Sequence, residues 1–228
     1  MLGAPIVGIP GLRAEKSTSP RTVFRSGTTA TFIAGGKIID GAISRDPGNT
    51  GNLDTLRAGL IMGKVTSGGK YAPSIMGLTN AAYTSGTSLT VTAAAAVELA
   101  RRVGATGTFT IAGPSVADGV VLTETVTYSL ISGTTVTITA LTNDYISGSF
   151  IMPNDGSEDP LTFIPDGTGI KVTDVDASNV SSVPFPEVPI AAEILTGNVV
   201  NYPSDAGLKA WLKGMLRQTG NWIFSDEW

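Results

Sequence analysis

Residues 56–73 read Leu-Arg-Ala-Gly-Leu-Ile-Met-Gly-Lys-Val-Thr-Ser-Gly-Gly-Lys-Tyr-Ala-Pro, and this stretch decides the fold. Apolar residues dominate its first half, where Gly59 and Gly63 interrupt them. Gly68 and Gly69 then lead into a short Lys-Tyr-Ala strand. A pair of strands joined by a two-glycine turn needs little more, because glycine supplies the positive φ that the turn requires. We therefore predict a hairpin turning at Gly68 and Gly69.

The composition also indicates a protein built mainly from strands. The 228 residues suffice for one large or two small domains with a well-buried core. Only 15% of the residues are charged, against about 25% in an average globular domain. With 28 glycines, 13 prolines and abundant threonine and serine, we expect a turn-rich, mainly β fold of the β-rich α+β class.

Several classes of function are disfavoured by what the chain lacks. Cysteine and histidine are both absent, so disulfides, zinc sites, cysteine redox chemistry and the commonest general base are missing. The net charge of −4 disfavours nucleic acid, whose phosphates repel an acidic protein. No apolar run is long enough for a transmembrane helix, and the first ten residues lack the basic start of a secretory signal. We expect a protein that is not an enzyme, uses no cofactor or metal, and binds neither nucleic acid nor membrane directly.

The middle of the chain reads as an inserted antiparallel β module over residues 79–149. Threonine alternates with apolar residues around residues 87–92, 108–111, 120–130 and 134–141. This period of two predicts antiparallel strands with one wet, threonine-rich face. Residues 93–103 interrupt the pattern with good helix formers and end at Gly104, which predicts a short helix.

Residues 36–78 and 150–228 are expected to form the core, which ends in an amphipathic helix. Ser204 or Asp205 is suited to cap its start and Gly220 to stop it. Lys209, Lys213 and Arg217 lie off the apolar face and towards the negative end of the helix dipole. The apolar face carries one stripe of side chains, Leu208, Trp211, Leu212, Met215 and Leu216.

Residues 1–35 read as an extended N-terminal arm. Pro5, Pro10 and Pro20 each push the preceding residue towards extended geometry. Such a segment is either a frayed terminus or a strand that orders when it joins a neighbouring sheet edge. Its branched apolar residues favour strand addition.

Two parts of the core resemble the bacteriophage head decoration, or capsid cement, protein family, with a decoration protein D-like core. The first is the order Leu-Arg-Ala-Gly, Met-Gly-Lys-Val-Thr and Gly-Lys-Tyr-Ala-Pro within residues 56–73. The second is Asp-Gly-Ser at residues 155–157, then Pro160 and Val-x-Asp-Val-Asp-Ala at residues 172–177. In the family the second part follows the first closely, so the β module would be an insertion.

The resemblance implies a structural virion protein that binds the outer surface of a capsid as a homotrimer. It would be assembled in the host cytoplasm and would stabilise the expanded head through contacts with the major capsid protein. The arm is the expected contact, with apolar side chains filling alternate pockets and arginines pairing with acidic groups. The expected capsid-contact residues are Ile6, Val7, Ile9, Leu12, Arg13 and Arg21.

Other motifs carry weaker hypotheses. Residues 59–66 lack the glycine spacing and the Ser or Thr after Lys64 that a phosphate-binding loop requires. Asp174 and Asp176 alternate like the first ligands of a calcium loop, but the glycine and the distal glutamate are missing. Acids within residues 155–159 could attract a cation, or could bond their own backbone in a turn.

Two other classes of function remain as alternatives. A phage tail, fibre or adhesive module would bind a host surface glycan through the β insert, using exposed aromatic side chains. The aromatic candidates on the insert are Tyr83, Phe109, Tyr128 and Tyr145. A hydrolase with paired carboxylates is a more remote alternative, because no acidic pair stands out.

Overall fold

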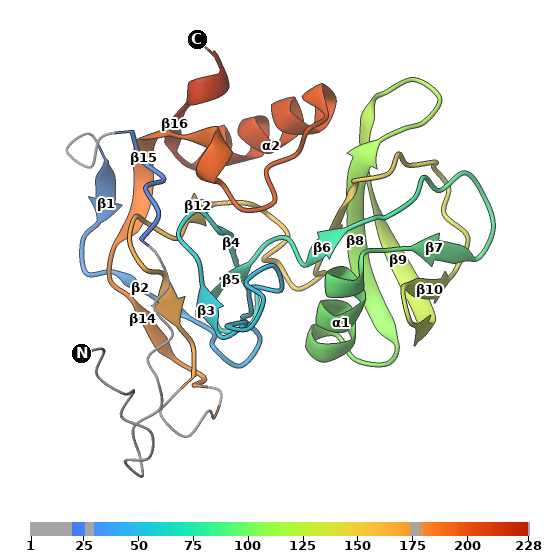
Figure 1. Ribbon diagram of the computed structural model, residues 1–228, viewed down its shortest axis with the longest axis horizontal. Helices are drawn as coiled ribbons and strands as arrows, with labels where there is room; N and C mark the ends of the chain where they lie inside the picture. The colour runs from blue at the N-terminus through green and yellow to red at the C-terminus, as the bar shows by residue number, and fades with distance from the viewer. Residues whose placement is uncertain (1–19, 26–29, 174–177, 179, 228) are drawn as a thin grey trace, which may run out of the picture.

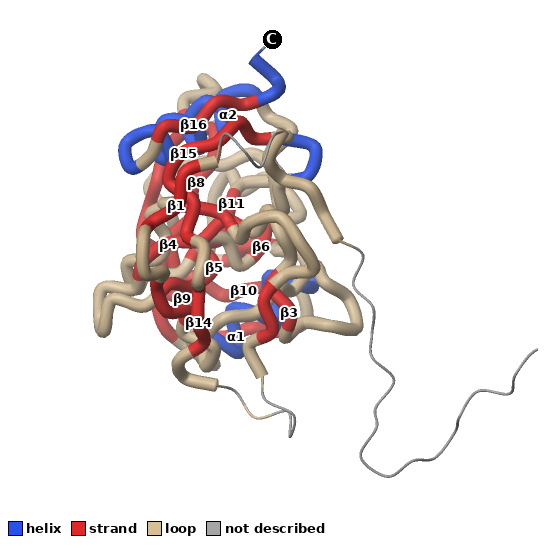
Figure 2. The backbone as a smooth tube through the Cα atoms, turned by 90° about the vertical axis from the view of Figure 1, so that its left-hand side faces the viewer, coloured by secondary structure: helices blue, strands red, loops and turns tan. Residues whose placement is uncertain are grey.

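The computed structural model describes residues 20–25, 30–173, 178 and 180–227. Strands hold 37% of these described residues and helices 15%, which confirms the expected mainly β, α+β class. Figure 1 shows a core built from the first and last parts of the chain, with a second body from the middle of the chain beside it. In the view of Figure 2, helix α2 (Ala206–Thr219) lies at one end of the molecule and helix α1 (Ala93–Arg102) at the other.

The predicted hairpin lies at the centre of the core. Strand β4 (Ile61–Lys64) pairs antiparallel with β5 (Tyr71–Pro73), and Lys64 lies opposite Tyr71. Gly68 and Gly69 have φ values of 85° and 67°, so the turn uses the positive φ expected of them. The hairpin belongs to a five-stranded sheet with the order β12 (Thr162–Phe163), β4, β5, β2 (Lys37–Ile39) and β14 (Val183–Phe185).

Two smaller sheets complete the core. One has the order β1 (Thr31–Ile33), β15 (Val188–Ile194) and β16 (Asn221–Phe224), and α2 joins the parallel strands β15 and β16. The other pairs β13 (Ile170–Lys171) with β3 (Thr55–Leu56). Short 3₁₀ helices cover Thr196–Asn198 and Ser225–Glu227.

Helix α2 begins and packs as its sequence predicts. Asp205 caps it, and its side chain accepts a hydrogen bond of 2.8 Å from the Leu208 amide. Leu208, Leu212 and Leu216 are buried in the core, and Gly220 ends the helix.

Lys213 departs from its expected place off the apolar face, because it is buried with 9% of its surface exposed. Its amine lies 2.8 Å from Asp226 and 3.5 Å from Glu227. Both acids come from the 3₁₀ helix after β16, so the burial of Lys213 depends on a tertiary ion pair.

The middle of the chain forms a small closed barrel. Its six-stranded sheet has the order β6 (Gly77–Leu78), β11 (Phe150–Met152), β8 (Gly107–Pro114), β9 (Val121–Ser132), β10 (Thr135–Ile138) and β7 (Ser88–Thr90). The first and last strands meet through hydrogen bonds of 2.9 Å from Asn80 N to Thr90 O and from Thr92 N to Leu78 O. A bridge between Thr79 and Val91 lies between these two bonds.

Helix α1 closes one end of the barrel. Thr92 caps the helix, and Gly104, with a φ of 119°, follows its last turn. Ala95, Ala96 and Leu99 pack into the barrel interior beside the inward side chains of the strands. These strand side chains include Leu89, Phe109, Ile111, Val126, Tyr128, Val136, Ile138 and Ile151.

The outer face of the barrel is the predicted threonine-rich face. Thr123, Thr125 and Thr127 on β9 lie opposite Ala112, Thr110 and Thr108 on β8, so their side chains share one face. A bulge at Ser129 then shifts the register with β10, and Leu130 is 56% exposed on the outside. Up to this bulge, the β9 residues that alternate with threonine in the sequence therefore point into the barrel.

The barrel and the core share a hydrophobic cluster. Ala112, Phe150 and Met152 project from the outside of the barrel and pack with Leu208 and Leu212 of α2. The six-stranded sheet thus takes in β6 and β11, which the sequence places outside residues 79–149. The division of the chain into domains stays a prediction.

The described part of the predicted arm lies against the core. Val23 and Phe24 are buried, and Phe24 forms a bridge with Ile194. Strand β1 pairs antiparallel with β15. Within the predicted arm, Val23, Phe24 and strand β1 therefore pack as part of the core. Among the described residues, no helix is long and apolar enough to cross a membrane.

Candidate functional site

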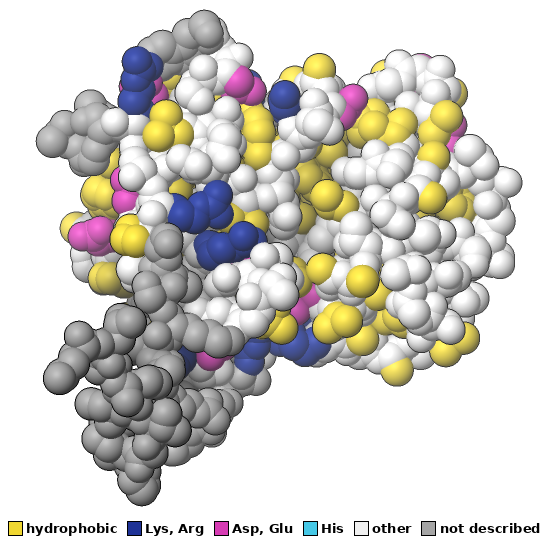
Figure 3. All heavy atoms as spheres, viewed as in Figure 1, with side chains coloured by type: hydrophobic (Ala, Val, Ile, Leu, Met, Phe, Trp, Pro, Cys, Tyr) yellow, Lys and Arg dark blue, Asp and Glu magenta, His cyan; other side chains and the backbone are white. Residues whose placement is uncertain are grey.

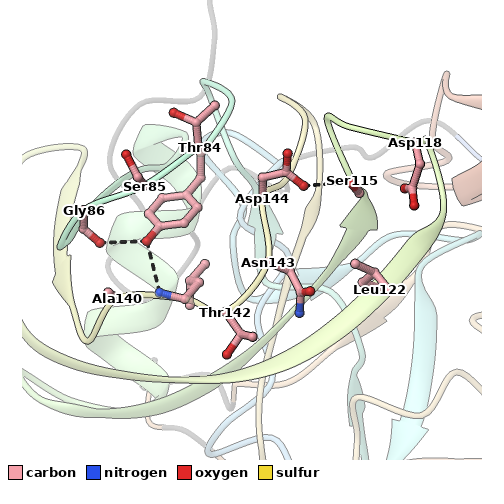
Figure 4. A pocket seen from close by; sticks show the side chains of 12 residues that line it. Thr84, Ser85, Gly86, Ser115, Asp118, Leu122, Ala140, Thr142, Asn143 and Asp144 are labelled. Carbon is pink, nitrogen blue, oxygen red and sulfur yellow. Dashed lines mark hydrogen bonds between the residues drawn. The ribbon is translucent and has the colours of Figure 1, made fainter.

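A hollow of about 500 Å³ opens at the end of the barrel opposite α1, and we call it the barrel mouth. Three connections line it: residues 83–86 between β6 and β7, residues 115–122 at the start of β9, and residues 140–144 after β10. They meet because antiparallel strands bring alternate connections to the same end of a sheet. Figure 4 shows Thr84 and Ser85 on one side, Ser115 and Asp118 on the other, and Thr142 and Asn143 between them.

Hydrogen bonds hold the two carboxylates of the mouth in place. The Ser115 hydroxyl donates to Asp144 at 2.6 Å (Figure 4). It also accepts from the Ala117 amide at 3.0 Å. One oxygen of Asp118 accepts from the Val120 amide at 3.0 Å. In each carboxylate a second oxygen remains for a further donor.

Glu124 on β9 fixes the connection that carries Thr142 and Asn143. Its carboxylate accepts hydrogen bonds from the Thr142 amide at 2.8 Å, from the Asn143 amide at 3.2 Å and from the Asn143 side chain at 3.1 Å. Burial acts to raise the pKa of Glu124, but these hydrogen bonds outweigh burial and leave the pKa below its usual value. Glu124 therefore stays ionised and holds the loop near neutral pH.

Tyr83 and Tyr145 form the floor beneath the mouth. They share a backbone bridge, and the Tyr83 hydroxyl donates to Gly86 O at 2.7 Å and accepts from the Leu141 amide at 3.0 Å. Burial and the nearby Glu124 carboxylate raise the pKa of Tyr145. The four aromatic candidates of the insert, Tyr83, Phe109, Tyr128 and Tyr145, are at most 4% exposed. They serve as core, so none offers an open ring for stacking on a glycan.

Acidic side chains line the mouth, but no basic side chain of the described residues does. Between Lys70 and Lys171 the basic residues of the sequence are Arg101 and Arg102. Both lie at the end of α1, which is the opposite end of the barrel. Figure 3 shows the Lys and Arg side chains on this face mainly over the core, while the barrel side is largely uncharged.

Arg101 and Arg102 join the barrel to the core. The Arg102 side chain is 1% exposed and donates to Pro73 O at 2.6 Å, to Asp155 at 3.0 Å and to the Ser157 hydroxyl at 2.6 Å. Arg101 pairs with Glu98 and donates to the carbonyl oxygen of Ile43. The two arginines thus have structural roles.

A second hollow of about 300 Å³ lies between α1 and the loop before β3. Exposed Leu53 and Val97 line it, together with Pro47, Ala93 and Ala94. Its surface is mainly apolar, although the side chains of Arg45, Glu98 and Arg101 also line it.

Most of the predicted capsid-contact residues, Ile6, Val7, Ile9, Leu12 and Arg13, lie outside the described residues. Arg21 is described, and its backbone forms a two-bond bridge with Gly167 at 3.0 and 3.1 Å. The sequence did not single out the barrel mouth. The sequence could have predicted the mouth from one pattern. Hydroxyl, amide and acidic residues occur in three connections between strands, and an antiparallel sheet brings these connections to the same end.

Two acids of residues 155–159 bond to the backbone and side chains of their own turn. The Asp155 carboxylate accepts from the Ser157 amide and hydroxyl at 3.0 and 2.7 Å, and Glu158 accepts from the Asp155 and Gly156 amides. These acids therefore order a turn. Asp174 and Asp176 lie outside the described residues. The described residues hold no group of three or more acidic side chains placed to share a metal ion.

No protein-family model, curated protein or solved structure matches the chain.

Proposed function

We propose that the protein is a capsid decoration protein that binds the outer surface of a phage head as a homotrimer and stabilises the expanded shell. The proposal is supported by the resemblance of residues 56–73 and 155–177 to that family. A ligand that binds the expanded shell alone stabilises it by RT ln(1 + L/Kd), where L is the concentration of free ligand. In this proposal the major capsid protein is the partner.

The observation that carries the proposal is the firm anchoring of the chain just after residue 19. The Val23 and Phe24 amides both donate to one oxygen of Asp166, at 2.5 and 3.0 Å. Arg21 pairs with Gly167 beside them. The chain at residues 21–24 is therefore fixed to the core, which is what the proposed arm requires of its attachment point.

The test combines mass and capsid binding. Light scattering of the purified full chain should give three times the mass of one chain, and the protein should pellet with bare expanded capsids at a saturable ratio. A chain that lacks residues 1–19 should keep its fold, by circular dichroism, and lose pelleting. A species that ignores expanded capsids would remove the proposed function, and unchanged pelleting of the truncated chain would remove the arm from it.

A further inference from the structure

The barrel mouth has the size and shape of a small-ligand site. Its volume of about 500 Å³ lies within the range of about 300 to 1,000 Å³ that is usual for ligand pockets. The mouths of β-barrels are also among the places where such sites recur.

The lining supplies both donors and acceptors. Thr84 and Ser85 present exposed hydroxyls, and Asn143 contributes its amide. The side chain of Thr142 also lines the mouth, but it bonds to Glu124. Asp118 and Asp144 each keep one carboxylate oxygen beyond those bonded to Val120 and Ser115. Leu122 and Leu141 add a partly exposed apolar surface.

The charge pattern excludes anionic ligands. The described residues that line the mouth include two carboxylates and no Lys or Arg, so a phosphate, sulfate or carboxylate group would be repelled. Hydroxyl groups suit the lining, because each can donate to a carboxylate and accept from Ser, Thr or Asn. The carbon-bound hydrogens of a sugar ring would lie against Leu122 and Leu141.

The lining is also held in place without a ligand. Glu124 fixes the backbone of Thr142 and Asn143, and the Tyr83 hydroxyl holds Leu141. A preformed site avoids the entropy cost of ordering its loops on binding.

We propose that the barrel mouth binds a neutral polyhydroxylated ligand, namely an uncharged sugar unit. This site is independent of capsid binding, which is assigned to the other body of the molecule. With hydrogen bonds as its main contacts and no exposed aromatic ring, the mouth should bind single sugars with a Kd of about 1 mM, or about −4 kcal/mol.

The test is saturation-transfer NMR on the full chain with glucose, galactose and N-acetylglucosamine at about 10 mM, ten times the expected Kd. Glucuronic acid and N-acetylneuraminic acid serve as anionic counterparts. We expect transfer to at least one neutral sugar and several-fold less to both acids. Absence of transfer to all three neutral sugars, or equal transfer to the acids, would overturn the proposal.

Matched variants locate the binding. The pair Thr84→Val and Ser85→Ala removes two exposed hydroxyls from the mouth, and should weaken binding about 30-fold at the usual value of two hydrogen bonds. The pair Thr125→Val and Thr127→Val removes two exposed hydroxyls from the outer face and should leave binding unchanged. Equal loss in both pairs, or unchanged binding in the first pair, would contradict the site.

Asp118→Asn probes the charge argument separately. The amide oxygen keeps the bond to the Val120 amide, so the loop keeps its shape while one negative charge is lost. Glucuronic acid should then bind more tightly relative to glucose. An unchanged ratio would show that the carboxylate does not face the ligand.

Discussion

At the scale of single residues, the loop between β2 and β3 depends on one buried acid. Asp46 is fully buried, and its two carboxylate oxygens accept from Arg57 Nε and Nη2 at 2.6 and 2.8 Å. It also accepts from the Arg57 amide at 3.2 Å. The Asp-Pro-Gly sequence at residues 46–48 is typical of a turn, but it does not reveal that Asp46 points inward, because its partner Arg57 is eleven residues away.

Removing this acid should be costly. Asp46→Ala leaves a partly buried guanidinium without its partner, and should lower the free energy of unfolding by about 3 kcal/mol. Urea denaturation followed by circular dichroism measures the loss. Glu187→Ala, at an exposed acid, is the control and should change the value by less than about 0.5 kcal/mol. Similar values for both variants would contradict a structural role for the ion pair.

At the scale of elements, the sequence predicts the units that obey a local period. The Gly68-Gly69 turn, the stripe of α2, the run of helix formers in α1 and the alternating strands of the barrel all follow from neighbouring residues. Lys213 and Leu130 depart from their patterns because a tertiary ion pair and a bulge decide their places. The barrel mouth was not predicted for the same reason, because it forms only where three connections that are distant in the sequence meet.

The contact between α1 and β6 depends on the absence of one side chain. A Cβ at Gly77 would lie 2.4 Å from the Ala95 Cβ and 2.8 Å from its Cα. Neither atom belongs to the flexible end of a side chain, so the helix would have to move. Gly77 therefore sets how closely α1 approaches the barrel.

Gly77→Ala should destabilise the protein by about 1–3 kcal/mol through overpacking. Gly214→Ala makes the same change within α2, where nothing lies within 4 Å of the new Cβ. It should instead stabilise the protein by up to about 1 kcal/mol, because alanine favours a helix more than glycine. Urea denaturation of both variants gives the two values, and equal signs would contradict the close approach.

At the scale of the whole molecule, the barrel and the core should unfold together. Phe150 and Met152 project from the barrel into the cluster that holds Leu208 and Leu212. Arg102 adds a buried link to Asp155. The sequence predicts the strands of the insert, but not that Phe150 and Gly77 belong to strands of its sheet.

Phe150→Ala tests this coupling and should cost about 3–5 kcal/mol. Trp211 on α2 and Trp222 on β16 pack in the core, so their fluorescence follows the core, while far-ultraviolet circular dichroism follows both bodies. The two signals should show one coincident transition, and the variant should shift both by the same amount. Separate midpoints would show that the barrel folds independently.

The closure of the barrel between β6 and β7 bears on solubility. An open sheet edge presents unpaired amides and carbonyls, and two copies can associate through such edges into aggregates. In the barrel every strand has a neighbour on both sides. When two copies touch through their barrels, they therefore meet through threonine hydroxyls, which water solvates well. Because their described strands are paired on both sides, the barrels offer no unpaired sheet edge through which the copies could associate into a fibre.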